Sequence, residues 1–171
     1  LILSVSFIGL AITGLALRFP DSWWVEVLRA AGMSEEVRRW LHRGFAVAMV
    51  GISAWHVVYM VATGRGRTLL RAMLPRPADV GEAINNIFFY LGLRREPPVF
   101  RRFDYTQKAE YWALIWGTVV MTITGFVLMF PELTTGWLPA WLVRVAEAIH
   151  FYEAILAVGA LQVDTRVVAA L

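Results

Sequence analysis

Four long apolar stretches alternate with polar connections along this chain. They cover residues 1–19, 38–62, 106–130 and 138–163. Each is near the ~20 residues that a helix needs to cross the hydrocarbon core of a bilayer. The pattern therefore predicts an all-α integral membrane protein in which four helices form a single transmembrane domain over residues 1–171. We expect the first span to be incomplete, because the chain opens directly in apolar sequence without a basic flank.

The connection between the first two stretches has a helical pattern of its own. In DSWWVEVLRAAGMSEE, the side chains of Trp23, Trp24, Val27 and Leu28 fall on one side of a helix. This spacing is typical of a short helix that lies in the membrane interface. An ordered loop explains the same residues equally well.

Composition supports the membrane assignment and removes several kinds of site. Hydrophobic residues make up 58% of the chain, against about 45–50% in globular proteins. Its tryptophans and tyrosines lie mostly near the ends of the apolar stretches, as in interfacial aromatic belts. The sequence contains no cysteine, which excludes disulfides, thiolate metal sites, iron–sulfur ligation and covalent haem attachment in this chain.

Charge predicts how the spans are oriented. Residues 63–108 contain nine basic and four acidic side chains, whereas residues 131–147 contain one basic and two acidic ones. By the positive-inside rule, the long basic connection and both termini face the cytoplasm of a bacterial inner membrane. We do not expect nucleic acid to be the partner of these arginines, because they lie between membrane spans.

An internal repeat indicates two similar helical hairpins that pack as a four-helix bundle. AITGLALRFP (11–20) closes the first span and TITGFVLMFP (122–131) closes the third. The second and fourth spans then also correspond, with His42 aligned to His150 and a glycine nine residues after each. Chance similarity between apolar segments is the alternative explanation.

The chain has three histidines, and all of them fall in apolar stretches. On a helix, the fourteen residues from His42 to His56 rise about 21 Å and return to within ~40° of the starting direction. Two haems at two depths of a membrane require this spacing, since each iron takes an axial imidazole from each of two facing helices. His150 supplies the facing partner for His42.

Other roles for the histidines are weaker but open. A lone membrane histidine is often a hydrogen-bonded packing residue, and this applies most directly to His56. A proton relay would need further acidic groups in the spans, and zinc would need three or four converging ligands. Glycines inside the spans suit either a flat macrocycle or ordinary small-residue packing: Gly44, Gly51, Gly117, Gly125 and Gly159.

Three segments resemble the membrane cytochrome b subunits that anchor formate dehydrogenases, thiosulfate reductases and related complexes, and are similar also to the hydrogenase cytochrome b. They are RFDYTQKAEYWALIWGTVVMTITGFVLMF (102–130), RRWLHRGFAV (38–47) and AEAIHFYEAILAV (146–158). The resemblance implies two b haems, with His42 and His150 as axial ligands of the haem near the outer face. His56 is the visible candidate for the second haem. The family's further histidine falls here on Asp164. We therefore expect the C-terminus to be incomplete or joined across a gap, and a protein with one haem is the alternative.

The resemblance also implies electron transfer between a quinone and a partner. Menaquinone or ubiquinone would react at the cytoplasmic side, and a periplasmic-side iron–sulfur protein or multihaem cytochrome c would dock at the outer face. Arg39 and Arg43 could pair with haem propionates or extend to the interface as ordinary surface cations. Tyr105, Gln107, Lys108 and Glu110 lie near the expected quinone site, although Lys108 and Glu110 could equally be surface charges at a helix start. A haem-free membrane anchor or assembly subunit, and a haem transporter or sensor, are the rival functions.

Overall fold

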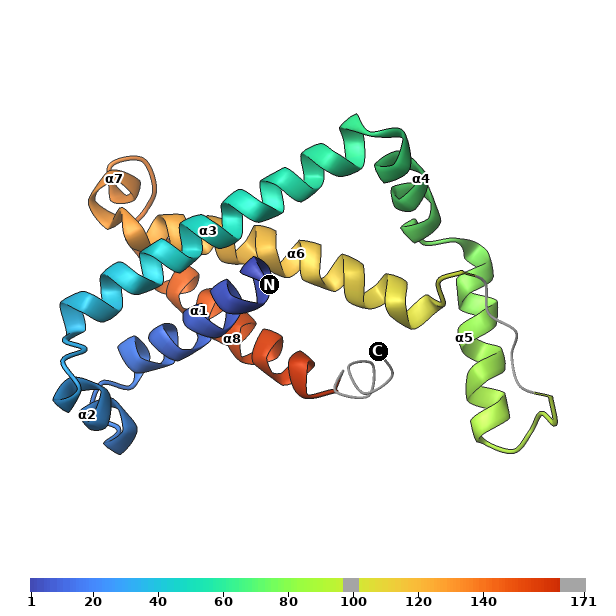
Figure 1. Cartoon of the computed structure of the whole chain (residues 1–171), viewed down its shortest axis with the longest axis horizontal. Coiled ribbons are helices and arrows are strands. Elements are labelled where there is room, and N and C mark those ends of the chain that lie inside the picture. Colours follow the sequence, from blue (N-terminus) through green and yellow to red (C-terminus); the bar gives the residue numbers. More distant parts are fainter. Residues whose placement is uncertain (97–101, 164–171) are drawn as a thin grey trace. The chain divides into compact units, whose positions relative to one another are not determined.

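The computed structural model describes residues 1–96 and 102–163, with side chains described as far as residue 160. The described residues form helices and no strands, which confirms the predicted all-α class (Figure 1). In chain order the helices are α1 (Ile2–Arg18), α2 (Trp23–Ala30), α3 (Glu35–Ala62), α4 (Gly64–Met73), α5 (Pro77–Tyr90), α6 (Tyr105–Met129), α7 (Pro131–Thr135) and α8 (Trp141–Val163). Asp164 lies outside the described residues.

Two of these helices, α3 and α6, are long and apolar enough to cross a membrane on length and composition alone. A third crossing is counted if α1 and α2, which meet at a bend of 109°, form one broken span. Helix α1, which has 17 residues, and helix α8 are not among the described helices that qualify as spans by themselves. Their assignment as the first and fourth spans stays a prediction.

The chain divides into two compact units, and α3 and α6 contribute residues to both. The first unit contains residues 1–55 together with the described residues from Thr118 onward. Within it, the ring of Phe19 packs edge-on against that of Phe151, with centroids 5.9 Å apart. Arg18 lies above the same Phe151 ring and pairs with Glu147 at 3.4 Å. These contacts join the end of α1 to α8.

The two repeats end their first helix in the same way. Phe19 has φ −122° and ψ 65°, and Phe130 has φ −128° and ψ 60°. Each precedes a proline, Pro20 or Pro131, whose ring disfavours helical geometry in the residue before it. The matching conformations support two hairpins of similar design, each closed by the same Phe-Pro stop.

A short helix does follow the first of these stops. Helix α2 confirms the helical alternative for residues 23–30 over the loop alternative. Val25 is its fully buried side chain, whereas Trp23 is 80% exposed and Val27 is 60% exposed. The protein-facing side of α2 therefore includes Val25, and the exposed aromatic side is the one available to an interface.

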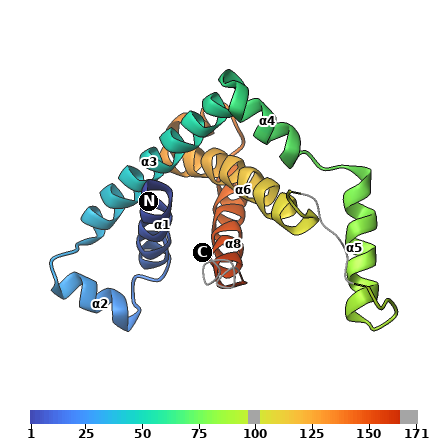
Figure 2. The same cartoon turned by 45° about the vertical axis from the view of Figure 1, so that its right-hand side comes forward.

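The second unit, residues 56–117, contains structure that the sequence analysis treated only as a basic connection. Helices α4 and α5 follow the end of α3 in this region (Figure 2). The Thr63 hydroxyl caps α4 by accepting a hydrogen bond from the Gly66 N–H at 2.9 Å. Helix α5 begins with Pro77 in its first turn, where a missing N–H costs nothing, and the Asp79 carboxylate accepts from the Arg76 N–H at 2.7 Å.

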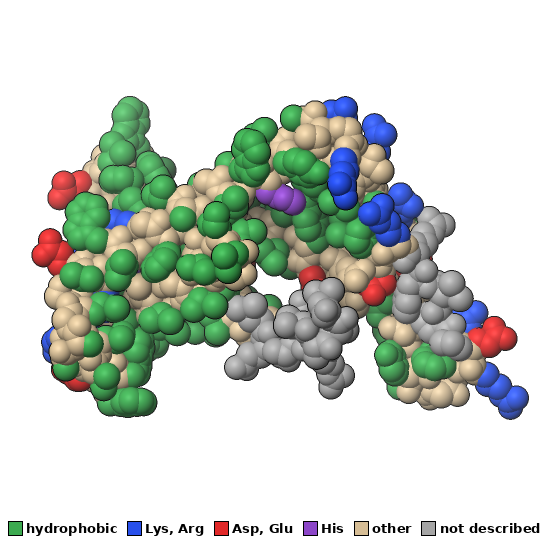
Figure 3. Space-filling model, viewed as in Figure 1, with side chains coloured by type: hydrophobic (Ala, Val, Ile, Leu, Met, Phe, Trp, Pro, Cys, Tyr) green, Lys and Arg blue, Asp and Glu red, His purple; other side chains and the backbone are tan. Residues whose placement is uncertain are grey.

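Side-chain chemistry differs between the two units. Basic side chains gather over α4 and beyond the end of α5, whereas apolar side chains dominate the visible face of the first unit (Figure 3). Large exposed hydrophobic side chains lie along α3 and α6, including Val47, Trp55, Leu114 and Trp116. Exposed apolar helix surfaces of this kind suit contact with lipid. The fold is therefore that of a membrane helical bundle.

Candidate functional site

Two threonine–histidine pairs occupy equivalent places in the two hairpins of the first unit. The Oγ1 atom of Thr13 on α1 lies 2.9 Å from Nδ1 of His42 on α3. The Oγ1 atom of Thr124 on α6 lies 2.8 Å from Nδ1 of His150 on α8. Each threonine belongs to the repeated Thr-Gly pair of the sequence. The repeat therefore encodes a way of holding one imidazole in each hairpin.

Hydrogen-bond donors and acceptors fix the tautomer of both imidazoles. The Thr13 hydroxyl donates its proton to the Gly9 carbonyl at 2.6 Å, and the Thr124 hydroxyl donates to the Val120 carbonyl at 2.7 Å. A hydroxyl has a single proton, so each threonine oxygen accepts from the imidazole Nδ1–H. In the neutral ring this places the free lone pair on Nε2, the atom that can ligate a metal.

The glycine of each Thr-Gly pair makes room for the same histidine. A Cβ atom on Gly14 would lie 3.1 Å from Cε1 of His42, and one on Gly125 would lie 3.3 Å from Cε1 of His150. Both distances are tighter than ordinary contacts, so a side chain there would press on the ring. Gly44, Gly51 and Gly159 have no such contact within 4 Å. Gly14 was absent from the glycines that the sequence analysis singled out, although the repeat contains it.

The two imidazole rings are neighbours within the first unit and are arranged edge to face. Their ring centroids are 6.4 Å apart and their planes are inclined by 71°. Two rings that ligate one iron from opposite sides have centres roughly 6 Å apart, because each metal–nitrogen bond is about 2 Å long. No group of three or more His, Cys, Asp or Glu side chains in the described ranges could hold a metal ion. A haem brings its other iron ligands in its macrocycle, so the spacing of these two rings suits that group.

The sequence of the chain matches a family model over residues 1–163, and the description of that family is prokaryotic cytochrome b561. The chain belongs to the prokaryotic cytochrome b561 family. Membership makes it a bacterial membrane protein of haem b electron transfer, which confirms the predicted membrane cytochrome b. No curated protein and no solved structure matches the sequence.

His56 has a different environment from the other two histidines of this cytochrome b561 family member. Its Nε2 lies 3.3 Å from the hydroxyl oxygen of Tyr111 in the second unit, with ring centroids 6.2 Å apart. The neighbour of His56 in this contact is thus a phenol and not a second imidazole. The described residues bring together one histidine pair, and the role of His56 as a ligand stays a prediction.

Arg39 and Arg43 are exposed on one side of the first turns of α3. Arg39 pairs with Glu35 at 2.5 Å, and the Arg43 guanidinium lies 5.6 Å from the centre of the Trp40 ring. Together with Glu36 they line a surface hollow. Their predicted pairing with haem propionates stays a prediction and would require Arg39 to exchange its present partner.

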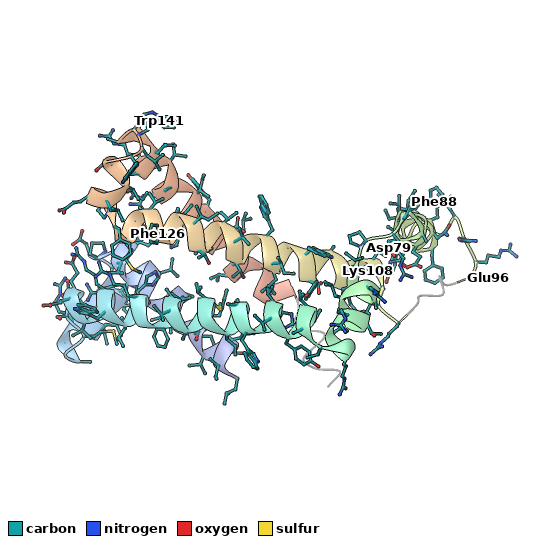
Figure 4. The ribbon with its side chains drawn as sticks, turned by 90° about the horizontal axis from the view of Figure 1, so that it is seen from above. Asp79, Phe88, Glu96, Lys108, Phe126 and Trp141 are labelled. Carbon is teal, nitrogen blue, oxygen red and sulfur yellow. The ribbon has the colours of Figure 1, made fainter. Side chains whose placement is uncertain are left out.

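Lys108 is not a surface charge. Its side chain is 5% exposed, and Nζ donates to the Asp79 carboxylate at 2.6 Å. Figure 4 shows the two side chains together where α5 meets the start of α6. The surface-charge alternative for Lys108 was wrong because Asp79, on a helix that the sequence analysis did not predict, reaches it. Glu110, in contrast, is exposed, which agrees with the prediction that it is a surface charge.

Further polar contacts tie α6 to α4 and α5. The Tyr105 hydroxyl accepts a hydrogen bond from the Asn86 side chain at 2.8 Å, and the Trp112 indole N–H donates to the Met73 carbonyl at 2.9 Å. Gln107 belongs to the helix start, where its N–H donates to the Asp104 carboxylate at 2.8 Å. The residues suggested near a quinone site thus include several with structural partners.

The Lys108 ammonium also sets the acidity of Asp79. Its hydrogen bond lowers the pKa of the Asp79 carboxyl below the ordinary value, and the hydrogen bond from the Arg76 N–H acts in the same direction. Burial opposes both effects. The carboxylate form is therefore the one that holds α5 to α6.

Proposed function

We propose that this protein is a membrane electron-transfer subunit that holds haem b between His42 and His150 and links a quinone pool to a redox partner at the outer face. The neighbouring imidazoles of His42 and His150, 6.4 Å apart between ring centroids, are the observation that supports the proposal. When bound, haem b supplies a one-electron centre. The threonines orient each ring and increase the basicity of the ligating nitrogen.

The quinone and the partner rest on the resemblance and on charge. The basic second unit predicts a cytoplasmic position for α4 and α5, which would place the predicted menaquinone or ubiquinone site on that side. A quinol gives up two electrons and two protons, so it needs nearby groups that accept protons. The partner would be an iron–sulfur protein or multihaem cytochrome c, as in the formate dehydrogenase and thiosulfate reductase type.

The number of haems is part of the proposal. His42 and His150 account for one haem near the outer face. A second haem on His56 needs an additional ligand, which the described residues do not place against His56. We retain two haems as the family-based prediction, with one supported by a visible pair.

The test is haem content in purified full-length protein, measured as pyridine haemochrome with reduced-minus-oxidised spectra. His42→Ala and His150→Ala should remove the same spectral component. His56→Ala is the matched control, because it changes the third histidine without touching this pair. Loss of different components would refute the shared haem. A wild-type protein without haem would instead favour a haem-free membrane anchor or assembly subunit.

A further inference from the structure

Arg38, at the start of α3, is a buried cation without an anion. Its side chain is 0% exposed. One terminal nitrogen donates to the Met33 carbonyl at 2.9 Å, but the buried Nε has no hydrogen-bond partner. No described carboxylate lies within 4.0 Å of its guanidinium. A charge in this position is costly unless something compensates it.

The other arginines of the first unit that form ion pairs are in a different situation. Arg18, Arg29 and Arg39 each pair with a glutamate, and each has at least half of its side chain exposed. Water already stabilises such groups, so their pairs contribute little. Arg38 combines full burial with an unpaired nitrogen, which points to a missing anionic ligand.

The position of Arg38 relates it to the histidine pair. It precedes His42 by four residues on the same helix, which corresponds to about 6 Å along the axis and ~40° around it. Arg39 and Arg43 lie roughly 60° and 100° to the opposite side of His42, toward the surface hollow. Arg38 is therefore the arginine that lies one turn above the ligating ring on the buried side of α3.

We propose that Arg38 binds a propionate carboxylate of the haem that His42 and His150 ligate. The inference rests on the proposed function and adds a positioning residue to it. A guanidinium forms strong, directional hydrogen bonds with a carboxylate, and the Nε of Arg38 has its donor free. The pair would neutralise both buried charges, fix the rotation of the macrocycle about the iron axis, and favour the reduced haem by placing a cation beside it.

The experiment compares ordinary haem b with its propionate dimethyl ester in the full-length protein, reconstituted in detergent. The ester keeps the macrocycle and iron but has no carboxylate. For each haem, the dissociation rate to an apoprotein acceptor and the midpoint potential are measured in wild type, Arg38→Met and Arg29→Met. Arg29→Met is the matched control, because it removes an exposed arginine of the same unit that already has Glu26 as its partner.

With ordinary haem, Arg38→Met should release haem roughly tenfold faster and have a lower midpoint potential, because a charge-assisted hydrogen bond is lost. With the ester, the same substitution should change the dissociation rate by less than about twofold and leave the midpoint potential as it is in wild type. Arg29→Met should resemble wild type with both haems. Equal effects of Arg38→Met on haem and ester would overturn the inference and assign Arg38 to its Met33 contact.

A second comparison uses wild-type protein alone, so it does not depend on whether the Arg38→Met variant folds. Wild-type protein should itself lose the ester roughly tenfold faster than haem, and equal rates would overturn the inference without any substitution. If wild type binds neither haem nor ester, the proposed function fails and the inference falls with it. If wild type binds haem in a way that depends on His42 but loses the ester no faster than haem, only the role of Arg38 is refuted.

Discussion

The Nδ1 atom of His150 lies 2.8 Å from the Oγ1 atom of Thr124. The same relationship joins His42 to Thr13 at 2.9 Å in the other hairpin. Each threonine hydroxyl donates its proton to a carbonyl of the preceding helical turn. Its oxygen can therefore only accept from the histidine, so both histidines are donors at Nδ1. Similar support of the two rings by separate hairpins suits a symmetric pair of axial ligands.

Removing either threonine acceptor should raise the midpoint potential of the bound haem. In Thr13→Val and Thr124→Val the imidazole loses its Nδ1 acceptor, becomes a weaker donor to iron and stabilises the oxidised state less. We expect a few tens of millivolts for each, since a hydrogen bond contributes about 1 kcal/mol and about 59 mV corresponds to a tenfold change in a one-electron equilibrium. Redox titration measures both. Shifts in two different haem components would contradict a shared haem.

The glycines beside the rings should tolerate a methyl group poorly. In Gly125→Ala the new Cβ would lie 3.3 Å from Cε1 of His150, which forces the ring to move and should cost about 1–3 kcal/mol. The low-spin electron paramagnetic resonance signal, which reports the orientation of axial imidazoles, should change. Gly159→Ala is the control, because nothing lies within 4 Å of its new Cβ. Identical signals from both variants would show that Gly125 does not position His150.

His56 has two suggested roles, as a haem ligand and as a packing residue, and its contact with Tyr111 suggests a variant that distinguishes them. His56→Phe retains an aromatic ring against Tyr111 but cannot ligate iron. If His56 ligates a second haem, as we predict, the variant should lose one haem per chain while the His42- and His150-dependent component remains. Tyr111→Phe is the companion variant, because it removes only the hydrogen bond at 3.3 Å. Unchanged haem content and potentials in His56→Phe would assign His56 to packing.

The ion pair of Asp79 and Lys108 should make the second unit sensitive to acid. The folded-state pKa of Asp79 is below its ordinary value, so its stabilising effect is complete above about pH 4 and is lost as the pH falls through the lowered pKa. Hydrogen exchange should therefore show α5 opening more readily at low pH than at neutral pH.

Asp79→Asn provides the control for this pH dependence. It should open α5 even at neutral pH, because the buried Lys108 ammonium loses its counter-ion, and it should show less additional opening in acid. Asp104→Asn changes another carboxylate of the same unit that is not paired with Lys108. A wild-type α5 with equal protection at both pH values would contradict the assigned role of the pair.

Local sequence patterns sufficed for much of the site. The length and hydropathy of the apolar stretches predicted α3 and α6, and the repeat aligned His42 with His150 before any contact was known. Both inferences depend on short-range periodicity, because a helix places its side chains at a fixed angle and rise per residue. The Thr-Gly pairs were visible in the same repeat, but their partners were not, since Thr13 and His42 are 29 residues apart.

The sequence by itself determined the membrane class, the two hairpins and the histidines that could meet. Only the tertiary structure decided that Lys108 is buried against Asp79 and that Arg38, not Arg39, is the buried arginine. Arg39 and Trp40 directly follow Arg38 in α3, and no pattern in these three residues marks which one the protein covers. Burial depends on which other helix packs against a given side, and that choice is made by contacts between residues distant in the sequence.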